Sequence, residues 1–249
     1  MRIAVAGASG TLGRLVTAAA ELAGHQVVPL SRSAGVDLLT GSGVAERLEG
    51  VHAVVDALNT ATQRRGPAEA FFATTSRTLL DAGTAAGVAH HVVVSIIGVD
   101  RVDSGYYFGK RAQEGVVRNG EVPWTILRSS QWHEFAQQAL GFVAFGPVSM
   151  VPRMLVQPVA AREVAQRLVS LAAGPPSEYA DELAGPERHQ LVDLARQVNE
   201  RRSLGRRIVP ITAPGRAGRA MRDGALLPEH DGVRGSQSFT QWLDDVGPR

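Results

Sequence analysis

Cysteine is absent from the 249 residues, and lysine occurs only once. Without cysteine, the chain forms no disulfide, offers no thiolate nucleophile and builds no cysteine-ligated metal site. Of the 26 basic residues, 25 are arginine and the remaining one is Lys110. The chain uses arginine where a positive charge alone suffices, so a retained lysine indicates chemistry that needs an ammonium group. The alternative is that one stray lysine falls there by chance.

The chain also has little net charge and no long apolar run. Its formal charge is +2, with 44% hydrophobic and 20% charged residues, the composition of an ordinary globular protein. This charge does not indicate nucleic-acid binding, and no apolar run reaches the roughly 18 residues of a membrane span. The N-terminus enters a predicted strand without a basic leader. We expect a cytoplasmic protein that binds neither nucleic acid nor membrane. The oligomeric state stays open, and a homodimer is compatible with the sequence.

The first fourteen residues carry the clearest motif. Residues 3–6 predict a buried strand, glycines follow at three-residue spacing, and a helix begins at Thr11 or Leu12. Glycine permits a tight turn and close approach of a pyrophosphate, while the helix start offers free N–H groups and the positive end of its dipole. A strand, glycine turn and helix in this order predict a dinucleotide site. The alternative is a tight turn in another α/β protein. The candidate ligands are Gly7, Ser9, Gly10, Thr11, Leu12 and Gly13.

The segment after the second predicted strand, 27–30, favours NADP(H) over NAD(H). In NAD-binding versions of such folds an acidic residue near this point holds the ribose hydroxyls. Here the segment is Ser31-Arg32-Ser33, and the Arg32 guanidinium suits a 2′-phosphate. Asp37 and Leu38 lie where such folds place residues beside the adenine, with a turn or cap as the alternative role for Asp37.

A strongly apolar strand over 51–58 supplies further candidates. The carboxyl ends of parallel strands face the ligand crevice, so we expect Leu58 and Asn59 to line the cofactor. Asp56 and Asn59 would equally serve as caps of the following loop.

Strands and helices alternate along the first half of the chain. Helical spacing over 68–86 and 106–119 separates strands predicted at 90–97 and 123–128. This alternation predicts an α/β fold, a Rossmann-like doubly wound parallel sheet. We assign residues 1–128 to an NAD(P)-binding core. Residues 129–249 are expected to form a small substrate-side cap that completes the same domain, with helices at 131–140, 159–172, 191–199 and 239–246 and a strand at 207–211.

Tyr106 and Lys110 form the constellation with the clearest chemistry. They are four residues apart on a predicted helix and project from one face, one turn apart. A nearby ammonium lowers the pKa of a phenol and makes it a better proton donor to a carbonyl oxygen. Lys110 also suits a hydrogen bond to the nicotinamide ribose, and Ser95, at the end of a strand, suits a substrate carbonyl. The alternative is a surface Tyr/Lys pair on an ordinary helix.

These residues together resemble the atypical short-chain dehydrogenase/reductases. The shared features are the turn Gly7-Ala-Ser-Gly10-Thr-Leu-Gly13, Arg32, the serine of Val-Val-Val-Ser95, and Tyr106-x-x-x-Lys110. Over roughly residues 1–170 the sequence is similar to the NmrA-like and nucleotide-sugar-epimerase-like NAD(P)-binding group. The resemblance implies a Rossmann fold, an NADP(H) site and, in active members, a Ser/Tyr/Lys set, here Ser95, Tyr106 and Lys110. Many active relatives have a proline-containing turn where this chain reads Arg128-Ser-Ser-Gln-Trp132.

The sequence therefore predicts an NADPH-dependent oxidoreductase that reduces a carbonyl, enone or quinone of a small apolar molecule. Two alternatives remain open. One is a non-catalytic NADP(H)-sensing regulator with a protein partner, suggested by the departure at residues 129–132. The other is a nucleotide-sugar epimerase or dehydratase. No metal is expected, because the His133-Glu134 pair lacks the second histidine of the zinc motif, position 137 being glutamine.

Overall fold

The protein is described by a computed structural model that covers residues 1–230 and 232–247. The chain divides into two compact units. The first contains residues 1–95, 104–128 and 162–181, and the second contains 96–103, 129–161 and the chain from Glu182 onward. The domain boundary at Arg128 stays a prediction, because these units follow contacts rather than chain order.

The first unit is built on a sheet in which the strand order reverses around the first strand. The order is β2-β1-β3-β4-β5, and the short β9 (Glu178–Tyr179) also pairs with β5. β1 pairs in parallel with β2 and β3, and β3 with β4. Most of these side chains are buried apolar residues, as expected for parallel strands covered on both faces. The strand bounds are β1 (Arg2–Ala6), β2 (Gln26–Leu30), β3 (Ala53–Asp56), β4 (His90–Ile96) and β5 (Trp124–Ser129).

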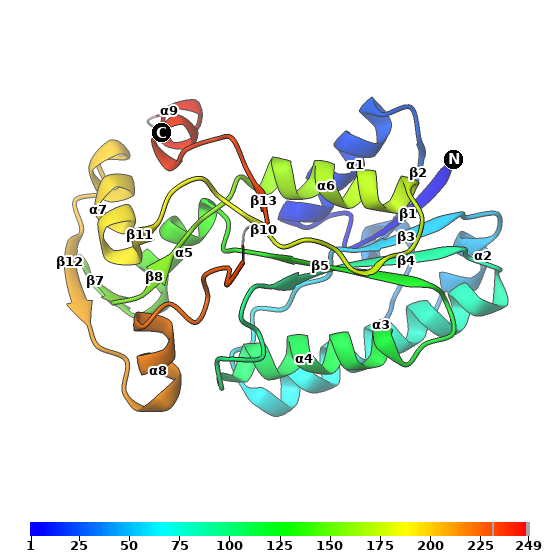
Figure 1. Ribbon diagram of the computed structural model, residues 1–249, viewed down its shortest axis with the longest axis horizontal. Coiled ribbons are helices and arrows are strands. Elements are labelled where there is room, and N and C mark those ends of the chain that lie inside the picture. The colour runs from blue at the N-terminus through cyan, green and yellow to red at the C-terminus, as the bar shows by residue number, and fades with distance from the viewer. Residues whose placement is uncertain (231, 248–249) are drawn as a thin grey trace. The chain divides into compact units, whose positions relative to one another are not determined.

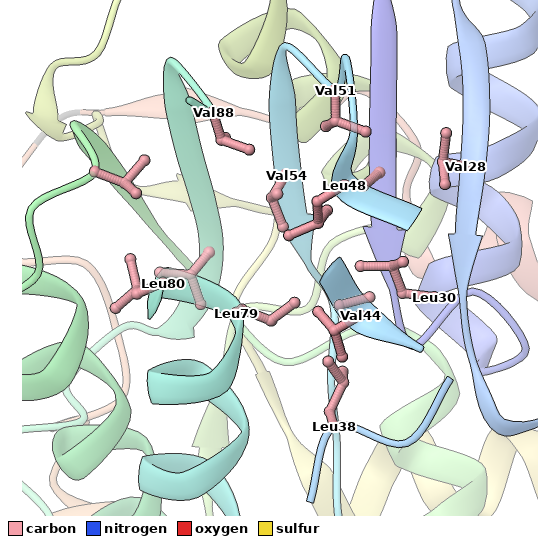
Figure 2. Packing of buried hydrophobic residues seen from close by; sticks show 14 of the residues in the cluster. Val28, Leu30, Leu38, Val44, Leu48, Val51, Val54, Leu79, Leu80 and Val88 are labelled. Carbon is pink, nitrogen blue, oxygen red and sulfur yellow. The ribbon is translucent and has the colours of Figure 1, made fainter. Parts of the chain in front are cut away.

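Helices cover both faces of this sheet (Figure 1). α1 (Thr11–Leu22) and α6 (Ala161–Ala173) lie on one face, and α2 (Val44–Leu48), α3 (Arg65–Ala85) and α4 (Gly105–Arg118) lie on the other. Figure 2 shows the core under the second group, where Leu30 and Val54 of the sheet meet Leu48 and Leu79 of the helices. The predicted doubly wound, Rossmann-like sheet is confirmed. Because β2 and β3 flank β1 on opposite sides, the loop after β1 lies at the switch point where such folds bind ligands.

A glycine of α4 lies directly against α3. A Cβ placed at Gly109 would lie 2.8 Å from Ala68 Cβ and 2.9 Å from Phe72 Cδ2. Any larger residue would therefore push the two helices apart. Both helices begin and end within three residues of their predicted positions.

The second unit contains short strands and four helices among its described residues. Leu183 of β10 pairs in parallel with Ser129, and β10 also pairs with β13. β7 pairs with β12 and β6, while β8 pairs with β11. The bounds are α5 (Glu134–Phe142), β6 (Ala144–Phe145), β7 (Val148–Pro152), β8 (Leu155–Val156), β10 (Leu183–Ala184), β11 (His189–Gln190), α7 (Leu191–Arg201), β12 (Arg207–Ile211), α8 (Gly215–Arg222), β13 (Val233–Arg234) and α9 (Phe239–Asp245).

The predicted helices and strand of the second half are found, at bounds shifted by up to three residues. The β6–β7 hairpin was not predicted, because glycine and proline interrupt that segment. α8 agrees with the spacing of Arg216, Arg219 and Arg222, which is that of one helix face. Within the described residues, no helix has both the length and the apolar character needed to cross a membrane.

Candidate functional site

The loop between β1 and α1 has the shape of an anion cradle. Gly7 adopts a φ of +76°, which side-chain-bearing residues rarely adopt. A Cβ at Gly13 would lie 2.0 Å from Gly7 O, so α1 approaches the loop this closely only because position 13 is glycine. Gly10 caps the helix without a side-chain hydrogen bond, which leaves the first-turn N–H groups available. These features fit a dinucleotide pyrophosphate.

The other loop candidates take different positions. Ser9 and Thr11 are exposed beside the cradle, whereas Leu12 is 3% exposed and packs into the core. Arg14 donates from Nη1 to Ser9 O and so steadies the loop from the first turn of α1. Cofactor binding through these residues stays a prediction.

Arg32 begins a short 3₁₀ helix, Arg32–Ala34, directly after β2. Its side chain is exposed, and no carboxylate is found paired with it in the described part of the chain. An exposed, uncommitted guanidinium at this position fits a 2′-phosphate.

The two adenine candidates turn out to have structural roles. Asp37 Oδ1 accepts a hydrogen bond from Leu39 N at 2.9 Å, the turn role considered as its alternative. Leu38 is 7% exposed and belongs to the core cluster of Figure 2. Contact of either residue with adenine stays a prediction.

The end of β3 lies against the glycine loop. A Cβ at Gly7 would meet Ala57 O at 3.0 Å, and Ala57 N donates to Ala6 O at 3.1 Å. Leu58 is partly buried against the core, while Asn59 is exposed. The segment after β3 therefore borders the cradle, and contact of Leu58 or Asn59 with a dinucleotide stays a prediction.

Asn59 connects this segment to α4. Its Oδ1 accepts hydrogen bonds from Thr60 N at 2.8 Å and from the Tyr106 hydroxyl at 2.6 Å. Nearby, a Cβ at Gly105 would lie 1.9 Å from Gln63 O. The loop after β3 therefore contacts the first turn of α4 at two points.

Tyr106 and Lys110 share one aromatic neighbour on α3. The Tyr106 ring packs edge-on against Phe72, with centroids 5.7 Å apart. Lys110 Nζ lies 4.7 Å from the centroid of the same ring. The Tyr106 and Lys110 side chains therefore contact the same aromatic ring, as their spacing on one helix face predicts.

The pKa of Tyr106 is raised, not lowered, and the cause is burial of the phenol. The expectation that Lys110 would lower this pKa is wrong for the structure described here. The Lys110 ammonium donates to Val94 O at 2.7 Å and to Gln113 Oε1, while the phenol donates to Asn59. Burial also lowers the pKa of Lys110 to about 8, partly offset by Asp56 and Glu114.

Ser95 lies in β4 next to the residue whose carbonyl accepts from Lys110. It is 2% exposed, and its Oγ has no hydrogen-bond partner among the described residues. Buried hydroxyl groups normally have a partner, so Ser95 Oγ is suited to one supplied by a ligand.

A group of buried polar residues around Lys110 was missed from the sequence. Asp56 is fully buried, and its Oδ2 accepts from Ser76 Oγ at 3.2 Å and from Gln113 Nε2 at 2.8 Å. Its Oδ1 accepts from Leu58 N at 3.1 Å, the capping role considered from the sequence. The only available signal was the i, i+3 spacing of Lys110 and Gln113, which is too common to be informative.

Comparisons with known proteins show the family and the fold. The family described as NAD(P)H-binding matches residues 7–173. No curated protein matches the sequence. The triphenylmethane reductase of Citrobacter sp., solved with NADP(H), has a similar fold, with a TM-score of 0.74 and 16% identity over 99% of this chain and 100% of that one.

Two further solved structures have similar folds. The NADPH-dependent quinone oxidoreductase of Escherichia coli, solved with NADPH, gives a TM-score of 0.73 and 16% identity over 98% of this chain and 99% of that one. The UDP-N-acetylglucosamine 4-epimerase of Bacillus cereus gives 0.71 and 16%, over 99% and 95%. These identities show likeness of fold alone. Together with the family match, they confirm the resemblance predicted from the sequence.

Proposed function

Because the chain belongs to the NAD(P)H-binding family, we propose that it is an NADPH-dependent reductase of a small apolar molecule that carries a carbonyl, enone or quinone group. The observation that carries the proposal is the placement of Tyr106 and Lys110 on one helix, in the same compact unit as the glycine cradle and Ser95. Two of the solved structures of similar fold are named as reductases of a triphenylmethane compound and of quinones, which suggests this substrate range.

The cradle and Arg32 would hold the dinucleotide. The N–H groups at the start of α1 would bind the pyrophosphate, and the Arg32 guanidinium would bind the 2′-phosphate and so favour NADPH over NADH. When bound, the nicotinamide supplies a hydride to the substrate carbon.

Tyr106 would supply the proton. Its raised pKa keeps the phenol protonated at physiological pH. When a ketone carbon receives the hydride, its oxygen becomes an alkoxide, a much stronger base than a phenolate, so even this phenol donates its proton to that oxygen. The substrate oxygen would replace Asn59 as the acceptor of the phenolic hydrogen, and Ser95 Oγ would donate a second hydrogen bond to that oxygen.

The test compares two adjacent tyrosines. Tyr106→Phe is expected to lower the rate of NADPH oxidation by about 10²- to 10⁴-fold with a quinone, enone or ketone panel, the usual contribution of general acid catalysis. NADPH affinity should be unchanged, and Tyr107→Phe should keep near-normal turnover. Equal rates for the two variants with a turned-over substrate would refute the assignment.

One observation favours a second candidate, a non-catalytic NADP(H)-sensing regulator. The Tyr106 hydroxyl and two Lys110 N–H groups already have protein partners, as a protein that only binds the dinucleotide would permit. This candidate requires that NADPH binds tightly and stays unoxidised with every substrate class tested. The epimerase alternative ranks third, supported by the likeness of fold to one such enzyme.

A further inference from the structure

A continuous chain of hydrogen bonds links the lone lysine to a buried carboxylate. Lys110 is 3% exposed, Gln113 1% and Asp56 0%. The ammonium donates to Gln113 Oε1, and Gln113 Nε2 donates to Asp56 Oδ2 at 2.8 Å. An amide carries its acceptor and its donors on opposite ends, so it can bridge a cation and an anion in only one orientation.

The carboxylate fixes that orientation. Asp56 Oδ2 also accepts from Ser76 Oγ, and Oδ1 accepts from the Leu58 backbone, so the carboxylate is held by three separate elements. Because an ionised carboxylate only accepts hydrogen bonds, it draws the NH₂ end of Gln113 toward itself. The amide oxygen must then point toward Lys110.

Other charged groups near the ammonium are already engaged or neutral. Glu114 forms a two-point ion pair with Arg128, at 3.0 and 2.8 Å. His91 Nε2 lies 4.0 Å from Asp56 Oδ2, and burial lowers the pKa of His91, which keeps the ring neutral. The Tyr106 phenol stays protonated. Asp56 is therefore the buried counter-charge available to Lys110, and Gln113 is the group that connects them.

We propose that Gln113 is a positioning residue for Lys110, holding the ammonium against β4 through an amide that Asp56 and Ser76 orient. The proposal rests on the proposed function and on the expected hydrogen bond from Lys110 to the nicotinamide ribose of the bound dinucleotide. With two of its N–H groups directed to Val94 O and Gln113, the ammonium keeps its third N–H for a ligand. Gln113 itself touches neither substrate nor dinucleotide in this scheme.

The pKa of Lys110 is a measure of the positioning role of Gln113. Burial lowers the pKa of Lys110, and the hydrogen bond from the ammonium to Gln113 Oε1 counters that effect because only the charged form gains from it fully. Removal of the amide should lower the pKa further. A residue with a purely packing role would leave this pKa unchanged when its amide is replaced by an apolar side chain of similar volume.

The single lysine makes the measurement direct. Protein grown with lysine carrying ¹³C at the ε carbon gives one lysine signal, whose pH titration reports the pKa of Lys110 without any substrate. We expect Gln113→Met, similar in volume, to lower this pKa by about one to two pH units, the range for a lost hydrogen bond to a charged group. Gln113→Leu, which also lacks the amide, should lower it as well. Gln138→Met, at an exposed position on α5, is the matched control and should leave it unchanged.

An unshifted lysine titration in folded Gln113→Met would overturn the proposal. If that variant does not fold, Gln113→Leu decides, and a pKa equal to or above that of the wild type would overturn it. Failure of the proposed function looks different. In that case the pKa shifts appear as expected, but Lys110→Ala oxidises NADPH with a turned-over substrate at the wild-type rate.

Discussion

The stability of this protein should rise with pH between 7.5 and 9, because its one lysine is buried. Lys110 has an ordinary pKa of 10.5, lowered to about 8 in the folded chain. Between these values the unfolded chain binds a proton that the folded chain has released. Stability rises with pH wherever the unfolded state binds more protons, so the cost of burying the ammonium disappears as pH increases through this window.

The size of the effect follows from the two pKa values. One proton bound only by the unfolded state gives a slope of about 1.4 kcal/mol per pH unit, and partial titration at both ends reduces the gain from pH 7.5 to 9 to about 1.2 kcal/mol. The chain has no cysteine to titrate in this range. Burial raises the pKa of Tyr106 and Tyr107, so they act in the opposite sense, but only near and above the ordinary tyrosine pKa of about 10.

Urea unfolding at pH 7.5, 8, 8.5 and 9 measures this gain. Lys110→Met is the control, because it removes the titrating group while retaining most of the side-chain volume, and its stability should be nearly flat over the same range. A wild-type protein whose stability is flat or falls between pH 7.5 and 9 would contradict the reasoning, as would an equal rise in Lys110→Met.

Two further predictions concern the expected dinucleotide site, formed by the cradle and Arg32. Arg32→Ala should weaken NADPH binding by roughly 10- to 150-fold, the value of a lost charged hydrogen bond, and leave NADH nearly unchanged; equal weakening of both in calorimetric titrations would show that Arg32 does not recognise the 2′-phosphate. Gly13→Ala should lower the free energy of unfolding by about 1–3 kcal/mol and weaken the binding of both NADPH and NADH, because the alanine Cβ would lie 2.0 Å from Gly7 O. Gly66→Ala, whose Cβ would meet nothing within 4 Å, should be neutral or slightly stabilising in the same denaturation assay, and equal losses in both variants would argue against the steric explanation.

The features that the sequence predicted correctly are local in the chain. The strand, glycine turn and α1 are consecutive, so their order alone identifies the cradle. The periodicity of α3 and α4 likewise depends on neighbouring residues. Short strands such as β10 and β11 exist through pairing with distant segments, and two residues carry too little pattern to be recognised.

The environment of Lys110 could not be predicted for the same reason. Its neighbours come from β3, β4, α3 and α4, and of these only Gln113 and Glu114 are near it in sequence. The four-residue spacing placed Tyr106 and Lys110 on one face, but it could not show that the ammonium turns to Val94 O or that the phenol donates to Asn59. The direction in which the Tyr106 pKa shifts depends on these distant contacts and on burial.

The two contacts between the loop after β3 and the first turn of α4 have a kinetic consequence. While Asn59 accepts the hydrogen bond from the Tyr106 hydroxyl, Tyr106 cannot donate that hydrogen to another acceptor. If the dinucleotide contacts Asn59 as predicted, its binding breaks the hydrogen bond from the Tyr106 hydroxyl to Asn59. A substrate that binds before the dinucleotide would find that hydroxyl still bonded to Asn59. Reduction would then follow a compulsory sequence, nucleotide before substrate, set by one amide oxygen.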